Sequence, residues 1–118
     1  MPLLKVQLSL PEISSTSSSN ARTEATEILS SVLGKSPDFV MVMIEVGLSA
    51  SFGGNLIEPG AYLEVKNVGD LPPGITDKLS QHLGELVEKE FGIALGRTYV
   101  EFQESKRHHW GWNGKTFA

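Results

Sequence analysis

The stretch Met1-Pro2-Leu3-Leu4-Lys5-Val6-Gln7-Leu8-Ser9-Leu10 decides how the rest of the chain is interpreted. Apolar residues alternate with polar ones, which predicts a strand over residues 2–9 with one buried face, ended by Pro11. A small residue after an initiator Met favours removal of that Met, so Pro2 is expected to begin the mature chain as a free secondary amine. Free α-amino groups titrate near about 7.7–8.0, where a general base is useful. The alternative is an ordinary, well-processed protein start.

Two segments have the apolar spacing of amphipathic helices. The first covers residues 18–33 after a serine-rich cap, and Gly34 is suited to end it. The second cannot begin until after Pro73, runs through Ile75, Leu79 and Leu83, and closes near Gly92. Both are therefore predicted to be helices with one buried side.

Three further segments are typical of strands. Residues 39–46 are almost continuously apolar, which predicts a central strand buried on both faces, with Met41 and Met43 filling the core. Residues 61–68 and 97–103 predict two more. The order strand, helix, strand occurs twice, and Phe39-Val40 resembles Tyr99-Val100, so a duplicated βαβ unit with parallel strands in each half is expected.

This order predicts one α/β domain over residues 1–118, with a four-stranded mixed sheet and both helices on one face. The other face is expected to be bare and apolar, and therefore to favour oligomerisation.

Composition excludes several classes of function. The chain has no cysteine, which rules out disulfides and thiolate chemistry, and 10 basic against 14 acidic residues give a net charge of −4, which disfavours binding to nucleic acid. The start does not look like a signal peptide and no apolar run approaches a membrane span, so the cytoplasm is the expected location.

Pro2 and Lys35 are expected at the same end of the sheet, because each precedes one of two parallel strands. A fixed cation there would bind a carboxylate and lower the pKa of a nearby amine. The alternative role for Lys35 is a helix C-terminal charge.

Several short motifs together resemble the macrophage migration inhibitory factor and D-dopachrome tautomerase family of the tautomerase superfamily. They span the chain in the family's order: Met1-Pro2-Leu3, residues 34–39 (GKSPDF), 50–54 (ASFGG), 58–61 (EPGA), Val68-Gly69, Arg97-Thr98-Tyr99 and 111–118 (GWNGKTFA).

The resemblance implies a homotrimer with active sites between subunits and keto–enol tautomerase activity on aromatic α-keto acids such as phenylpyruvate, with D-dopachrome as an artificial substrate. Pro2 would be the acid/base, Lys35 would bind the substrate's carboxylate or keto oxygen, and the Val68 N–H would bind the same end. The pocket would be lined by Leu3, Phe39, Tyr99 (from the adjacent subunit), Trp110, Trp112 and Phe117. No cofactor or metal is implied.

The chain departs from the family pattern at four positions. Glu101 stands where Asn meets the ring end of the substrate, which costs desolvation beside a phenyl ring and predicts low activity. Gly60 and Asn67 replace a common Cys and Ser, and Trp110 replaces a smaller residue.

The alternatives are a cytokine-like binding protein with a vestigial pocket, and a related hydratase or dehalogenase. The second lacks the arginines that those enzymes use, since Arg22, Arg97 and Arg107 have no evident claim to such a role. Adjacent His108 and His109 are expected on opposite faces of a strand, as a surface pair rather than a metal site.

Overall fold

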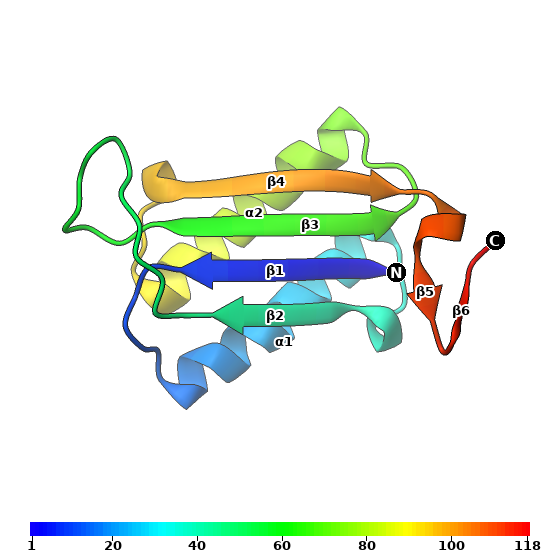
Figure 1. The fold of residues 1–118 in the computed structure, drawn as a ribbon, viewed down its shortest axis with the longest axis horizontal. Helices are drawn as coiled ribbons and strands as arrows, with labels where there is room; N and C mark the ends of the chain where they lie inside the picture. The colour runs from blue at the N-terminus through cyan, green and yellow to red at the C-terminus, as the bar shows by residue number, and fades with distance from the viewer.

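The computed structural model describes residues 1–118 as a four-stranded sheet with two helices behind one face (Figure 1). The elements are β1 (Pro2–Leu8), α1 (Ser15–Leu33), β2 (Met41–Glu45), β3 (Ala61–Val68), α2 (Pro73–Phe91) and β4 (Thr98–Ser105). The strand order is β2-β1-β3-β4, in which β1 and β2 are parallel, β3 and β4 are parallel, and β1 and β3 are antiparallel. The predicted mixed sheet and its duplicated βαβ units are confirmed.

Local capping sets the ends of the two helices. The Ser14 side chain accepts a hydrogen bond from the Ser17 N–H at 3.0 Å, so α1 begins earlier than the predicted residue 18. Pro73 is the first residue of α2, where its missing N–H costs nothing. Gly34 and Gly92 follow the helices in the left-handed conformation, as predicted. Neither helix combines the length and apolar character that crossing a bilayer requires.

The internal duplication extends into the connections. Each half passes from its helix through a left-handed glycine to a short 3₁₀ turn, η1 (Pro37–Phe39) or η2 (Leu95–Arg97), and then to its second strand. Phe39 is therefore the structural counterpart of Arg97, and the predicted match between Phe39 and Tyr99 is wrong.

The core lies between the sheet and the helices, and alternation along the strands supplies half of it. Even-numbered residues of β1 and odd-numbered residues of β3 are buried, and the facing helical residues complete one cluster: Leu4, Val6, Leu8, Leu63 and Val65 from the strands, with Ala25, Leu29, Leu79, Leu83, Leu86 and Val87 from the helices. Burying this apolar surface is the main favourable term in folding.

β2 is an edge strand, so the prediction of a central strand buried on both faces is wrong. Only Val42 and Ile44 pack against the core, whereas Met41 and Met43 are 59% and 42% exposed. The two methionines do not fill the core as predicted. The strand also starts at Met41 rather than residue 39, because Pro37–Phe39 form the 3₁₀ turn.

The uncovered face of the sheet is largely polar, which corrects the expectation of a bare apolar face. The Lys66 ammonium lies 3.0 Å from the Glu64 carboxylate, and the Gln7 amide donates to Glu45 at 2.8 Å. Side chains on this face alternate with the core residues, and in β1 and β3 they include Lys5, Gln7, Glu64 and Lys66. Met41 and Met43 are the main apolar exception, so the case for oligomerisation rests on them and on the site below.

Candidate functional site

One end of the sheet gathers segments from the whole chain. β1 and β2 begin there and β3 and β4 end there, and a small hairpin of β5 (Gly111–Trp112) and β6 (Lys115–Thr116) lies beside the start of β1 (Figure 1). The hairpin turns at Asn113-Gly114, whose φ angles of 53° and 85° suit a tight turn with two left-handed residues. Asn-Gly was the local signal for this hairpin, which the sequence interpretation did not use.

Pro2 is buried at this end, with its ring on the helix side of the sheet. The Val68 backbone N–H donates to the Met1 carbonyl oxygen at 3.4 Å. A carbonyl oxygen just before the Pro2 nitrogen is thus bound by a backbone donor of β3. This N–H would become free for another oxygen if Met1 were removed.

Lys35 is held close to the same point. Gly34 ends α1, the Lys35 N–H donates to the Ser30 carbonyl at 3.1 Å, and the Ser30 hydroxyl donates to the Lys35 carbonyl at 2.6 Å. The Lys35 ammonium then reaches the Val68 carbonyl at 3.4 Å. The predicted proximity of Lys35 to the start of β1 is therefore found in the fold.

The environment favours a neutral amine at the chain terminus. Burial, and then the charge of the Lys35 ammonium, lower the pKa of the Met1 amine below its ordinary value of 8.0. Met1 is half-buried and Pro2, next to it, is buried. A lowered pKa leaves more of such an amine unprotonated at neutral pH.

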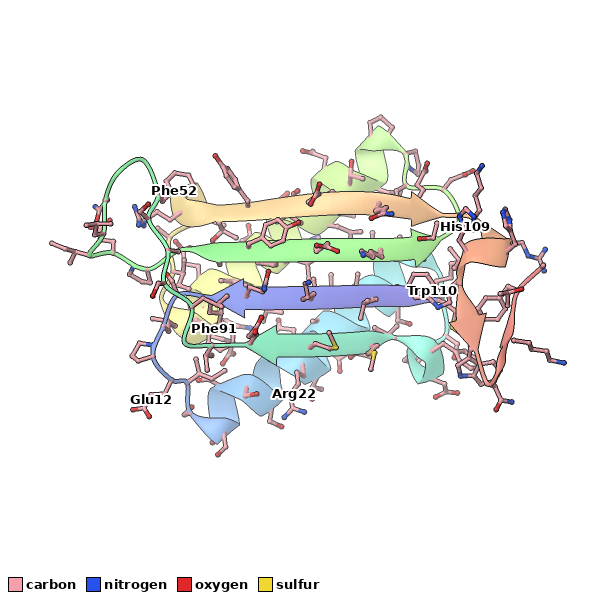
Figure 2. All side chains as sticks on the ribbon, in the orientation of Figure 1. Glu12, Arg22, Phe52, Phe91, His109 and Trp110 are labelled. Carbon is pink, nitrogen blue, oxygen red and sulfur yellow. The ribbon has the colours of Figure 1, made fainter.

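Aromatic side chains flank this end. The Phe39 and Trp112 rings meet edge to face with their centroids 5.2 Å apart, although both remain substantially exposed. Trp110 lies beside the start of β1 (Figure 2), and the Phe117 N–H donates to the Trp110 carbonyl at 3.2 Å. Leu3 follows Pro2 in the same strand but faces the uncovered side of the sheet.

Tyr99 and Glu101 are not brought to Pro2 within one chain. Tyr99 is the second residue of β4, at the opposite end of the sheet, where its ring centroid lies 5.2 Å from that of Phe52. Glu101 lies on the uncovered face and accepts a hydrogen bond from the Tyr62 hydroxyl. Contacts with the Glu101 and Glu64 carboxylates, together with burial, raise the pKa of the Tyr62 phenol.

An apolar cavity of about 300 Å³ lies at the Tyr99 end, away from Pro2. Its wall includes Gln7, Leu48, Phe52, Tyr62, Arg97 and Tyr99. The loop that forms its rim has no regular pattern, so the sequence alone does not specify the shape or the walls of this cavity.

None of the three arginines is a free cation at the Pro2 end. Arg97 donates to the carbonyls of Glu58 and Pro59, Arg22 to that of Ser18, and Arg107 to that of Phe117. All three side chains donate hydrogen bonds to backbone carbonyls. This agrees with setting aside the hydratase and dehalogenase reactions, which need arginines that bind the substrate.

The adjacent histidines lie in a 3₁₀ turn, η3 (Arg107–His109), and not in a strand. Their ring centroids are 4.1 Å apart, so the prediction that they point to opposite faces is wrong. A 3₁₀ turn rotates successive side chains by about a third of a turn instead of the half turn of a strand, so neighbouring rings can come close.

Asn67 is the residue at this end that sequence reasoning noted only as a departure. It is 1% exposed and lies on β3 directly across from Pro2. Its sequence signal is an amide side chain at a position of β3 that the alternation through Leu63 and Val65 places on the buried face.

Comparison with known proteins agrees with the geometry. A macrophage migration inhibitory factor homologue from Brugia malayi is 27% identical over 118 residues, covering 100% of both chains. The crystal structure of a homologue from Prochlorococcus marinus matches with a TM-score of 0.91 at 34% identity, over 98% of this chain and 99% of that one. The structure of Leishmania major MIF2 matches with a TM-score of 0.89 at 29% identity, over 98% and 97%. The family model described as macrophage migration inhibitory factor (MIF) matches residues 1–118, and the chain therefore belongs to this family.

Proposed function

We propose that the protein is a keto–enol tautomerase for aromatic α-keto acids of the phenylpyruvate type, with Pro2 as general acid/base after Met1 is removed. Family membership supports a tautomerase or MIF-like role. The observation that carries the finer proposal is the hydrogen bond from the Val68 N–H to the Met1 carbonyl beside Lys35. The Met1 oxygen occupies a position in which a substrate oxygen would meet a backbone donor and a cation.

The proposed base has suitable surroundings. Burial and Lys35 lower the pKa of the Met1 amine, and the same causes at a free Pro2 nitrogen would leave it less protonated at neutral pH than an ordinary α-amine. A neutral secondary amine has a free lone pair on nitrogen, so it can accept a proton from the substrate directly.

The proposed reaction moves one proton and no other atom. In ketonisation, the Pro2 nitrogen removes the enol O–H proton, the oxygen electrons form the carbonyl, and the prolinium returns the proton to the neighbouring carbon. In the reverse direction the nitrogen takes the proton from carbon, and negative charge develops on oxygen. Lys35 and the Val68 N–H are the groups that would stabilise that charge.

The ring of the substrate would meet apolar walls at the same end. Phe39 and Trp112 already pack edge to face, and an aryl ring could join them by similar contacts. Leu3, Trp110 and Phe117 remain proposed pocket residues.

We propose that a homotrimer completes the site. The single chain leaves Tyr99 and Glu101 at a distance from Pro2, so a neighbouring subunit would have to supply them. Exposed Met41 and Met43 on edge strand β2 offer apolar surface for such a contact. Because the Glu101 carboxylate already accepts a hydrogen bond from the Tyr62 hydroxyl, part of its hydrogen-bonding capacity would be satisfied beside the aryl ring, but desolvating the charge would still keep activity low.

The direct test measures ketonisation of phenylpyruvate enol by wild type, Pro2→Gly and a form that retains Met1, with the mature N-terminus identified by mass spectrometry. Wild type should be active. Pro2→Gly and the form that retains Met1 should be inactive, because the first has no proline and the second has its Pro2 nitrogen in an amide bond. Equal rates for wild type and Pro2→Gly would contradict the mechanism and favour a binding protein with a vestigial pocket.

Subunit complementation tests the shared site. Pro2→Gly and Tyr99→Ala homotrimers should each have low activity, and unfolding and refolding them together should restore part of it, because some mixed interfaces combine an intact Pro2 with an intact Tyr99. An absence of recovery in mixtures shown to contain both subunits would contradict a site between subunits.

A further inference from the structure

Asn67 is the only buried polar side chain of the fold, and its carboxamide oxygen has no hydrogen-bond partner. A buried acceptor without a donor destabilises the folded chain, so such a group calls for an explanation. The explanation must be a donor that reaches this oxygen in the working protein.

The sheet register places Asn67 next to the proposed base. Asn67 pairs with Pro2 across the antiparallel strands, and both side chains lie on the helix side. The bond from the Val68 N–H to the Met1 oxygen flanks this pair, which makes it the close, non-hydrogen-bonded kind with Cα atoms about 4.5 Å apart.

The two ends of the Asn67 amide face different neighbours. A Cβ built on Gly69 would lie 3.5 Å from the Asn67 amide nitrogen and 3.7 Å from the Lys35 ammonium nitrogen. The nitrogen is thus the end of the amide nearer Gly69, and the oxygen lies farther from it. Lys35 itself donates to the Val68 carbonyl, which leaves the Asn67 oxygen unpaired.

We propose that Asn67 is a positioning residue whose carboxamide oxygen accepts a hydrogen bond from the protonated amine of Pro2. While Met1 is attached, Pro2 has no N–H, and the oxygen stays without a partner. Removal of Met1 would create a nitrogen that carries two N–H groups when protonated. The inference rests on the proposed function only in taking that free amine to be the mature N-terminus.

The consequence is a balance of opposing effects on the amine. Burial and Lys35 favour its neutral form, whereas an acceptor at Asn67 favours its charged form. Neighbouring segments also carry Asp38, Asp70 and Glu104, but Lys35 is the charged group that acts on the chain's terminal amine, and Glu104 is occupied by the Leu71 N–H at 2.6 Å. Asn67 would therefore keep the proton available for return to the substrate.

The test is an NMR titration of mature protein labelled with ¹⁵N-proline, which reads the Pro2 amine without any substrate. Asn67→Leu removes the acceptor at similar volume and should lower the pKa of the amine by about one unit. Asn67→Asp adds a charge and should raise it. Gln103→Leu, at an exposed position of β4, is the control and should leave it unchanged.

Two further readouts separate this role from a merely structural one. The acid limb of the pH profile of kcat/KM should move with the amine pKa, down in Asn67→Leu and up in Asn67→Asp. In the form that retains Met1, thermal unfolding should show Asn67→Leu at least as stable as wild type, because there an unpaired polar group is replaced by an apolar one.

An amine pKa in Asn67→Leu equal to that of wild type and the Gln103 control would overturn the proposal. If Asn67→Leu does not fold, Asn67→Asp decides, and an unchanged pKa there overturns it too. A shifted pKa in a protein without tautomerase activity would support the Asn67 contact and refute the proposed function. An unshifted pKa in an active enzyme that needs Pro2 would refute the Asn67 contact and support the proposed function.

Discussion

Replacing Lys35 by methionine should separate two effects of its charge. The ammonium is fixed by a well-anchored backbone and would form a charge-assisted hydrogen bond to the substrate oxygen. Such bonds are worth about 1.5–3 kcal/mol, so kcat/KM for phenylpyruvate enol should fall roughly ten- to 150-fold. The same change removes the nearby positive charge that lowers the terminal amine's pKa, so that pKa should rise.

The sign of the pH effect follows from protonation of the base. The amine acts when neutral, so the acid limb of kcat/KM should move to higher pH in Lys35→Met. The effect on stability has the same origin. The pKa of the terminal amine is below 8.0 in the folded chain and 8.0 in the unfolded chain. At pH values between these two pKa values the unfolded chain therefore binds more protons than the folded chain. The free energy of unfolding thus falls as the pH drops from about 8 through the folded pKa. In Lys35→Met the folded-state pKa of the amine should lie closer to the unfolded value of 8.0, so the pH range over which stability changes should be narrower.

The assay follows enol decay by absorbance across pH, and chemical denaturation checks folding. Lys35 donates only one long hydrogen bond, at 3.4 Å to Val68, so its loss should cost less than about 1 kcal/mol of stability. Lys66→Met is the matched control, because that ammonium pairs with Glu64 on the uncovered face. Unchanged kcat/KM in Lys35→Met, or an equal loss in Lys66→Met, would refute the role of Lys35.

Three further changes test the fold and the proposed trimer. Gly34→Ala should destabilise by about 1 kcal/mol because its φ is 64°, whereas Gly74→Ala, in the first turn of α2, should be neutral or stabilising; equal melting temperatures would contradict this. Leu83→Ala should cost about 2–5 kcal/mol in chemical denaturation because Leu83 is fully buried, and Leu56→Ala, 79% exposed, almost nothing. Met43→Lys should shift the proposed trimer toward monomer in analytical ultracentrifugation with unchanged circular dichroism, and an intact trimer would place the interface elsewhere.

The local elements were predictable because their causes lie close together in the chain. Alternation through Leu4, Val6 and Leu8 determines the buried face of β1, and a glycine after each apolar repeat determines where the two helices end. The repeated order of elements was then enough for the mixed sheet with helices on one face.

Strand neighbours were not predictable from these patterns. An apolar run such as Val40-Met41-Val42-Met43 is compatible with the centre or the edge of a sheet, because hydrophobicity does not specify which strand lies beside it. The structure places this run at the edge and leaves both methionines exposed.

The sequence by itself determined the fold class, the family motifs, and Pro2 and Lys35 as candidates for one site. Only the tertiary structure decided that the Val68 N–H meets the Met1 oxygen, that buried Asn67 lies across from Pro2, and that Tyr99 and Glu101 lie away from both. Each of these facts depends on strand register and strand order. Pairing between distant segments sets both, and no pattern within a single segment records it.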